Sequence, residues 1–121
     1  MSEPFFYNCN LVKVVDGDTI DVDVDLGFDC WLRNKRVRLM GIDTPESRTR
    51  NLKEKALGLA AKDRLIELCG QKLRLQSQGI DKYGRILGVP YTIDGLDICN
   101  ILVEESHAVP YFGGKKTHIW G

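Results

Sequence analysis

The 121-residue sequence has no long hydrophobic run, no paired cysteines and only two histidines. No stretch approaches the roughly 20 apolar residues that span a bilayer, so we expect no membrane association. The first ten residues, MSEPFFYNCN, lack a basic start followed by a long apolar stretch, and therefore predict no secretory signal. We expect a cytoplasmic protein, with a phage or another mobile element as one candidate source.

The cysteines do not predict a metal site. They are widely separated in the sequence, at Cys9, Cys30, Cys69 and Cys99. A zinc site normally shows closely spaced ligand pairs, and the isolated His107 and His118 do not complete one. We expect four reduced thiols, each in the core or near the surface, and two histidines with structural or surface roles.

Net charge is also lacking, because 17 basic residues balance 17 acidic ones. This balance argues against a purely electrostatic nucleic-acid binder. The distribution is uneven, however: residues 16–29 hold six aspartates and no basic residue, whereas residues 33–38 hold four basic ones. Such segregation suits a site that holds a metal beside a phosphate.

Alternation of apolar and polar residues predicts strands over 10–15, 19–26, 35–42, 72–77 and 85–92. In the second strand, one face carries Ile20, Val22, Val24 and Leu26, and the opposite face, which we expect to be solvated, carries Asp21, Asp23 and Asp25. These aspartates imitate the start of an EF-hand, but Leu26 and Leu32 occupy the positions that need glycine and glutamate.

Two helices complete the predicted fold. Asn51 and Glu54 form a capping-box-like pair, Leu57, Ala61, Leu65 and Leu68 recur at helical spacing, and Gly70 ends the helix. A second helix covers about 96–105. Five strands and two helices predict an α+β fold, a five-stranded OB-fold barrel forming one domain over 1–121, with an irregular tail from about 113.

Acidic residues gather at two predicted turns, in Asp16-Gly17-Asp18 and in Asp43-Thr44-Pro45-Glu46. Asp18 lies an even number of residues before Ile20 and Val22 and so shares their apolar face. We therefore expect its carboxylate on the interior side, where it needs a partner. Oxygen ligands without sulfur or nitrogen favour calcium or magnesium. The alternative is that both segments are merely turn formers.

Two arginines could face a phosphate, Arg38 in the third strand and Arg85 after the turn Asp81-Lys82-Tyr83-Gly84. Planar guanidinium groups match phosphoryl oxygens and stabilise charge that develops on them. Surface ion pairing is the alternative for either arginine taken alone.

Taken together, three segments resemble the staphylococcal nuclease (thermonuclease) family: VDGDTI at 15–20, RVRLMGIDTPE at 36–46 and DKYGR at 81–85. The similarity runs in order from about Leu11 to Phe112. It implies an OB-fold barrel of the staphylococcal nuclease type and a calcium-dependent endonuclease that hydrolyses DNA and RNA with low sequence specificity, leaving 3′-phosphate ends.

The resemblance also implies residue roles. One calcium ion would be held by Asp18, Asp43 and the backbone carbonyl of Thr44, with Asp16 supporting the site from nearby. Glu46 corresponds to a proposed general base, and Arg38 and Arg85 to the arginines that clamp the phosphate. Lys82 and Tyr83 match positions that contact a terminal phosphate of the nucleotide. Tyr111 or Phe112 would stack on a base.

The chain departs from the type member in its longer hairpin between Asp18 and Arg38 and its shorter loop between Glu46 and Arg85. We expect a monomer. A non-catalytic OB-fold nucleic-acid-binding module is the main alternative, although such modules typically lack the acidic set present here. A calcium-binding structural protein is the third reading, and it gives no role to Arg38 and Arg85.

Overall fold

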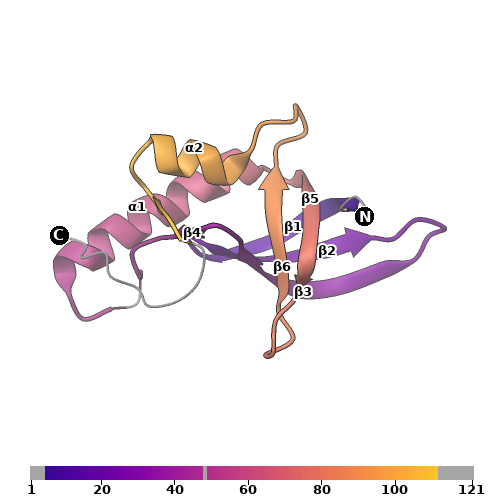
Figure 1. The fold of residues 1–121 in the computed structure, drawn as a ribbon, viewed down its shortest axis with the longest axis horizontal. Helices are drawn as coiled ribbons and strands as arrows, with labels where there is room; N and C mark the ends of the chain where they lie inside the picture. The colour runs from indigo at the N-terminus through magenta and orange to yellow at the C-terminus, as the bar shows by residue number, and fades with distance from the viewer. Residues whose placement is uncertain (1–4, 48, 112–121) are drawn as a thin grey trace.

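A computed structural model describes residues 5–47 and 49–111. Its elements in chain order are β1 (Phe6–Asp16), β2 (Thr19–Asp25), β3 (Trp31–Leu39), β4 (Ile42–Asp43), α1 (Leu52–Cys69), β5 (Lys72–Ile80), β6 (Ile86–Tyr91), α2 (Ile98–Glu104) and β7 (Val109–Pro110) (Figure 1). The tail from 113, predicted to be irregular, lies outside the described residues, as does Phe112. None of the helices in the described part is long and apolar enough to cross a membrane.

Five strands close into a barrel in the order β1-β2-β3-β6-β5, and β5 pairs back onto β1. The pairings are antiparallel except at the β3–β6 seam, where Val37, Arg38 and Leu39 pair in parallel with Ile86, Leu87 and Gly88. Figure 1 shows α1 and α2 packed together beside the barrel. The predicted five-stranded barrel with two helices is confirmed.

The barrel interior is apolar because alternate residues of each strand point inward. Ile20, Val22 and Val24 of β2 are all buried, as the alternation predicts. Leu26, predicted to share that face, is 43% exposed, because β2 ends at Asp25 and Leu26 bonds across the hairpin turn to Cys30.

The prediction of a solvated aspartate face is wrong at Asp21, which is only 4% exposed. Asp21 lies between Lys13 of β1 and Arg36 of β3 in the register of the sheet. Its two carboxylate oxygens accept hydrogen bonds of 3.0 and 3.3 Å from Arg36. Two long cationic side chains therefore cover this carboxylate and compensate its charge.

The acidic and basic segments of the sequence become neighbouring strands. Aspartates of β2 and of the preceding turn pair with arginines of β3 at three levels, in Asp18–Arg38, Asp21–Arg36 and Asp23–Arg33, at 3.5, 3.0 and 3.2 Å. Much of the charge segregation is therefore neutralised between strands, and only part of it remains for a functional site.

Strand boundaries differ from the prediction around the hairpin and after β3. β3 begins at Trp31 rather than at residue 35, so the connection between β2 and β3 is shorter than predicted. It stops at Leu39, where Gly41 takes a positive φ of 84° and turns the chain. The following β4 pairs with β7, a two-residue strand. β7 was not predicted, because it contains Pro110.

Helix α1 begins as predicted, with the Asn51 side chain accepting from the backbone N–H groups of Lys53 and Glu54. The prediction of its buried face is wrong by one residue near the start of the helix. Leu57, predicted to be buried, is 42% exposed, and Gly58 is buried instead. Gly58 touches the loop after β4, and a larger residue would not fit at this contact.

Candidate active site

A polar cavity of about 400 Å³ opens where three distant segments meet. The ends of β1 and β2, the outer face of β3 and the loop after β4 contribute to it, together with the start of β6. Its lining residues are Val15, Asp16, Asp18, Thr19, Arg36, Arg38, Thr44, Glu46 and Arg85. The structure thus brings together six residues that the sequence proposed as functional.

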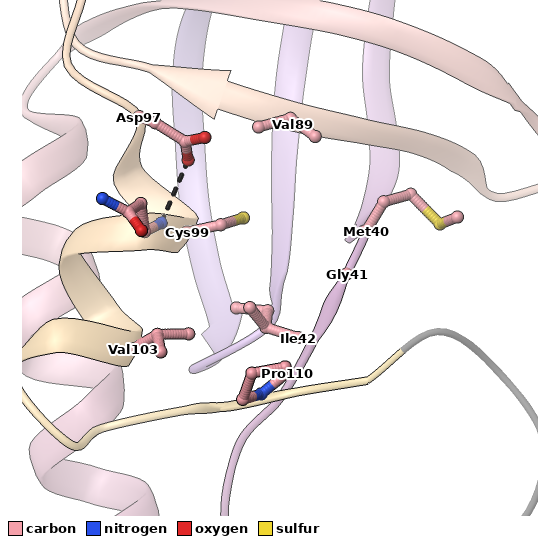
Figure 2. Close-up of a pocket in the computed structure, with 9 residues that line it drawn as sticks. Met40, Gly41, Ile42, Val89, Asp97, Cys99, Val103 and Pro110 are labelled. Atoms are coloured by element: carbon pink, nitrogen blue, oxygen red, sulfur yellow. Dashed lines mark hydrogen bonds between the residues drawn. The ribbon is translucent and has the colours of Figure 1, made fainter.

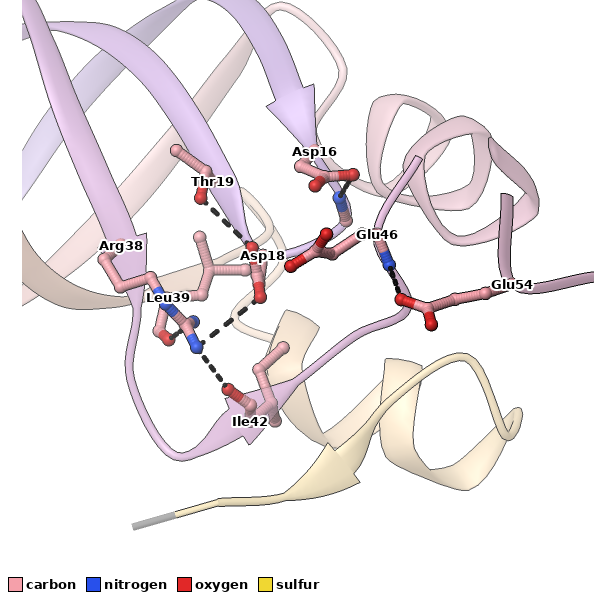
Figure 3. A network of polar contacts seen from close by, with 9 residues as sticks. Asp16, Asp18, Thr19, Arg38, Leu39, Ile42, Glu46 and Glu54 are labelled. Atoms are coloured by element: carbon pink, nitrogen blue, oxygen red, sulfur yellow. Dashed lines mark hydrogen bonds and ion pairs between the residues drawn. The ribbon is translucent and has the colours of Figure 1, made fainter. Parts of the chain in front are cut away.

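The best-defined interaction in the cavity is the ion pair of Arg38 and Asp18, whose charged groups lie 3.5 Å apart. Only 14% and 13% of the two side chains is exposed. Asp18 also accepts a hydrogen bond from Thr19, and Arg38 donates to the backbone carbonyl groups of Leu39 and Ile42 (Figure 3). These bonds fix the guanidinium group at the cavity wall.

Glu46 faces the same space from the loop after β4. Figure 3 shows its carboxylate and that of Asp18 turned toward one another, with Asp16 close by. Two carboxylates that face each other repel unless a proton or a cation lies between them. The exposed Glu46 side chain is also accessible to a water molecule.

Helix α1 holds the loop that carries Glu46. The backbone N–H of Glu46 donates to the Glu54 carboxylate at 3.0 Å, and that of Ser47 donates to Asp16 at 3.3 Å. A Cβ atom on Gly58 would lie 2.6 Å from the Glu46 carbonyl carbon and the Ser47 nitrogen. The predicted capping box is therefore incomplete, because Glu54 binds the active-site loop rather than the Asn51 N–H.

Arg85 is positioned by the turn that precedes it. Its guanidinium Nε lies 2.7 Å from the Asp81 carboxylate, which also accepts from the backbone N–H groups of Tyr83 and Arg85. Partial burial tends to raise the pKa of Asp81, but these hydrogen bonds outweigh it and hold the pKa below its usual value. The carboxylate therefore stays ionised and keeps Arg85 beside the cavity.

A second cavity, the tyrosine cavity, shares Arg38 and Arg85 with the polar cavity. It measures about 320 Å³ and is lined by Arg38, Leu39, Met40, Gly41, Ile42, Asp81, Arg85, Leu87 and Tyr111. The backbone N–H of Tyr111 donates to the carbonyl of Gly41 at 2.8 Å, which fixes the chain at this point. Arg38 and Arg85 thus line both cavities, and the tyrosine cavity is the more apolar of the two.

The remaining predicted residues lie outside the polar cavity. Lys82 and Tyr83 are exposed at the β5–β6 turn, with the Lys82 ammonium 5.2 Å and the Arg85 guanidinium carbon 5.7 Å from the Tyr83 ring. Asp43 is buried, 6% exposed, and precedes Thr44 in the wall of the cavity.

The donor set fits a hard cation. Among the described residues that line the polar cavity, Asp16, Asp18, Thr44 and Glu46 supply oxygen atoms, and no sulfur or imidazole donor is present. The hydroxyl oxygen of Thr44 is buried without a hydrogen-bond partner in the described structure. Within residues 5–47 and 49–111, no three His, Cys, Asp or Glu cluster as metal ligands. A calcium ion would therefore need backbone and water oxygens as well.

A third cavity, of about 270 Å³, lies between α2 and the β4–β7 pair (Figure 2). Its carboxylate, Asp97, is the N-cap of α2 and accepts from the backbone N–H of Asn100 at 3.0 Å. The lining is otherwise largely apolar, with Ile42, Val89 and Val103 around it. The Asp97 carboxylate is thus already used to cap helix α2.

Sequence reasoning missed Arg36, Thr19 and Glu54 as parts of the site. Arg36 was detectable, because it precedes Arg38 by two residues and so lies on the same face of the strand. For Thr19 the only signal in the sequence is that it directly follows Asp18, and its position opposite Arg38 is known only from the sheet register. Nothing in the sequence indicates that Glu54 bonds to the loop rather than to the helix cap.

The closed five-stranded barrel with two attached helices places the chain in the OB-fold class of α+β proteins. Comparison with known proteins gives the family. The family model described as "Staphylococcal nuclease homologue" matches residues 36–118, and the chain belongs to this family.

Several named proteins are similar to it. "Micrococcal nuclease" of Shigella flexneri is 40% identical over 117 residues, 88% of this chain and 60% of the relative. "Thermonuclease" of Staphylococcus intermedius is 42% identical over 78 residues, 62% and 43% of the two chains. An "Uncharacterized endonuclease" of Escherichia coli is 33% identical over 102 residues, 84% and 59%. The chain thus spans about half the length of these relatives.

Proposed function

We propose that this chain is a nuclease that hydrolyses phosphodiester bonds of DNA and RNA with low sequence specificity. The observation that carries the proposal is the convergence of Asp18, Arg38 and Glu46, with Arg85, around one polar cavity. Membership of the staphylococcal nuclease homologue family and the nuclease names of its relatives support it.

The arginines suit the binding of a phosphodiester. Arg38 and Arg85 would hold the scissile phosphate and stabilise the negative charge that develops on its oxygens. Arg38 is held by Asp18 and by backbone carbonyls, and Arg85 by Asp81, so both guanidinium groups are positioned beside the cavity before substrate binds. A base attached to this phosphate could then enter the tyrosine cavity and stack on Tyr111.

Glu46 is the candidate general base. Its exposed carboxylate can accept a proton from a water molecule that attacks phosphorus in line with the leaving oxygen. Family resemblance supports departure of the 5′-oxygen, which leaves 3′-phosphate ends. Lys82 and Tyr83, near Arg85 on the β5–β6 turn, would contact a terminal phosphate.

Calcium is the proposed cofactor, held by the carboxylate of Asp18 and the backbone carbonyl of Thr44, with Asp16 in support. The carboxylate of Asp43, which is buried next to Thr44 and does not line the cavity, is the further proposed ligand. When bound, a calcium ion polarises a phosphoryl oxygen and neutralises developing charge. It would also relieve the repulsion between the facing carboxylates of Asp18 and Glu46. We further propose that the protein acts as a cytoplasmic monomer.

One assay tests the proposal. Supercoiled plasmid, single-stranded DNA and RNA are incubated with protein in calcium, magnesium or chelator, and the product ends are analysed. We expect cutting of all three in calcium, conversion of plasmid to nicked and linear forms, 3′-phosphate ends, and no cutting in chelator. Undiminished cutting in chelator would remove the metal from the proposal. Binding without cutting in every condition would favour the non-catalytic module.

A further inference from the structure

The polar cavity contains a third arginine, Arg36, to which neither the sequence motifs nor the proposed chemistry gives a role. It precedes Arg38 on β3 by two residues, and the Val37 side chain between them is fully buried in the core. Arg36 and Arg38 therefore project from the same outer face of the barrel, with their Cα atoms about 6.5–7 Å apart.

Arg36 is held in place by Asp21. The guanidinium Nε and Nη2 atoms donate to the two carboxylate oxygens at 3.0 and 3.3 Å. A guanidinium group has five N–H donors, so this fork leaves further donors for a ligand. Half of the Arg36 side chain is exposed, 49%, whereas Asp21 is almost wholly covered.

The charge of this cluster is positive. Lys13 of β1 lies on the other side of Asp21, with its ammonium nitrogen 3.9 Å from the carboxylate. Lys13 and Arg36 therefore share the single negative charge of Asp21, and this cluster has a net charge of +1 beside the polar cavity. In the register of the sheet, the Asp21–Arg36 pair lies two residues along from the Thr19–Arg38 pair, and the inward-facing pair Ile20–Val37 lies between them. The two outward-facing pairs are therefore neighbours on the same face.

We propose that Arg36, oriented by Asp21, binds the phosphate next to the scissile one. The inference rests on the proposed function, in which Arg38 holds the scissile phosphate. Residues i and i+2 of a strand are spaced much like consecutive phosphates of an extended single strand, so two arginines of one face can contact two successive phosphates. The polar cavity is thereby adapted to a polynucleotide, with at least one phosphate beyond the bond that is cut.

The neighbouring pair Arg33–Asp23 provides a matched control. It joins the same two strands at 3.2 Å, but Arg33 does not line the polar cavity and stacks instead on Trp31, 4.7 Å from the ring centre. Both arginines pair across the strands with an aspartate of β2. Only Arg36 is expected to contribute to a phosphate subsite.

The kinetic test compares a dinucleotide, which has one phosphodiester, with a short single-stranded oligonucleotide. For Arg36→Ala, we expect the ratio of kcat/KM for oligonucleotide to kcat/KM for dinucleotide to fall about tenfold, the loss of one charge-assisted hydrogen-bonding contact. Arg33→Ala should leave this ratio unchanged. Equal ratios in the two variants, or equal loss on both substrates in Arg36→Ala, would overturn the proposal.

A folding defect is separated from a lost contact by a second variant. Arg36→Gln keeps a side-chain N–H donor for the buried Asp21 but removes the charge, so it should lower the substrate ratio while retaining the urea midpoint of the unmodified protein. A ratio that recovers fully in Arg36→Gln would show that Arg36 acts only by supporting the sheet.

Binding is measured separately from cleavage, by fluorescence anisotropy of the same oligonucleotide in chelator. Removing one phosphate contact should make the slope of log K against log salt shallower by about 0.7. We expect this change in Arg36→Ala and not in Arg33→Ala. If the unmodified protein cuts neither substrate, the proposed function fails, and the salt slopes still decide whether Arg36 contacts a phosphate. Identical slopes in both variants would refute the subsite.

Discussion

The Glu54 carboxylate accepts a hydrogen bond of 3.0 Å from the backbone N–H of Glu46, the residue proposed as general base. Glu54 belongs to the first turn of α1, so this helix directly holds the loop that carries Glu46. This bond and the hydrogen bond from the Ser47 N–H to Asp16 together define the path of the loop.

The Glu54 bond predicts a positioning effect on catalysis. Glu54→Ala should lower kcat about tenfold, the loss of a hydrogen bond to a charged group, and change KM much less, because substrate does not contact this residue. Glu54→Gln retains an acceptor oxygen and should recover most of the rate. Glu67→Ala, at an exposed position near the other end of α1, is the control. A uniform fall in stability without a change in kcat would contradict the prediction.

Gly58→Ala should disturb the same loop. At an unhindered helix position this change stabilises a protein by up to about 1 kcal/mol. Here the new methyl group would lie 2.6 Å from backbone atoms of Glu46 and Ser47, so we expect a loss of about 1–3 kcal/mol in the free energy of unfolding and a lower kcat. Urea unfolding and initial rates measure the two effects. A more stable and fully active variant would show that the contact is loose.

Removal of the proposed catalytic groups should have large effects. Glu46→Gln and Arg38→Ala should each lower kcat at least about a hundredfold, since each group would supply roughly 3–4 kcal/mol of transition-state stabilisation. Arg38→Lys keeps the charge but loses the planar fork, and should remain well below the unmodified rate. Circular dichroism checks that each variant is folded. Normal turnover in a folded Arg38→Ala protein would remove its assigned role.

The contact of α1 with α2 should depend on pH. Glu105 receives two hydrogen bonds, of 2.6 and 2.9 Å, from Arg64, and these hold the pKa of Glu105 below its usual value. A depressed pKa contributes stability above the unfolded-state value, about 4.3, and that contribution disappears as pH falls through the folded-state pKa. The difference in urea midpoint between the unmodified protein and Glu105→Gln should therefore shrink in acid. A constant difference would disprove the linkage.

Thiol reactivity should be confined to Cys30. Burial raises the pKa values of Cys9, Cys69 and Cys99 to about 12, whereas Cys30 is exposed at the hairpin. Since the thiolate is the reactive form, a thiol reagent at neutral pH should label one site rapidly in the folded protein and four after unfolding. Cys30→Ser should abolish the rapid phase. Rapid labelling of a second cysteine would indicate local opening of the core.

The sequence predicted the barrel because its apolar alternation is regular where strands face one core. Ile20, Val22 and Val24 show this pattern clearly, and the DGD and DTPE turns lie where the strands end. The face occupied by Asp21 could not be predicted from alternation, because its burial depends on Lys13 and Arg36 in neighbouring strands. The polar pattern is the same for a solvated aspartate and for one covered by cross-strand cations.

Motif spacing found most of the residues around the polar cavity, but not the contacts that orient them. Asp18, Arg38, Glu46 and Arg85 carry the chemistry that phosphate binding needs, and their residue types are informative by themselves. Glu54 bonds to Glu46 only because α1 packs closely at Gly58, and such an approach depends on tertiary structure. Local sequence around Glu54 equally favours a capping box, which the structure does not complete.

Closure of the barrel has a consequence for when the protein can act. Arg38 and Arg85 belong to opposite sides of the β3–β6 seam, and Leu87, two residues after Arg85, is the partner of Arg38 in that ladder. The two guanidinium groups come from remote parts of the chain and meet only when the β3–β6 junction has formed. A chain in which this seam is still open would lack the pair of arginines, so the proposed nuclease activity would begin only once the seam has closed.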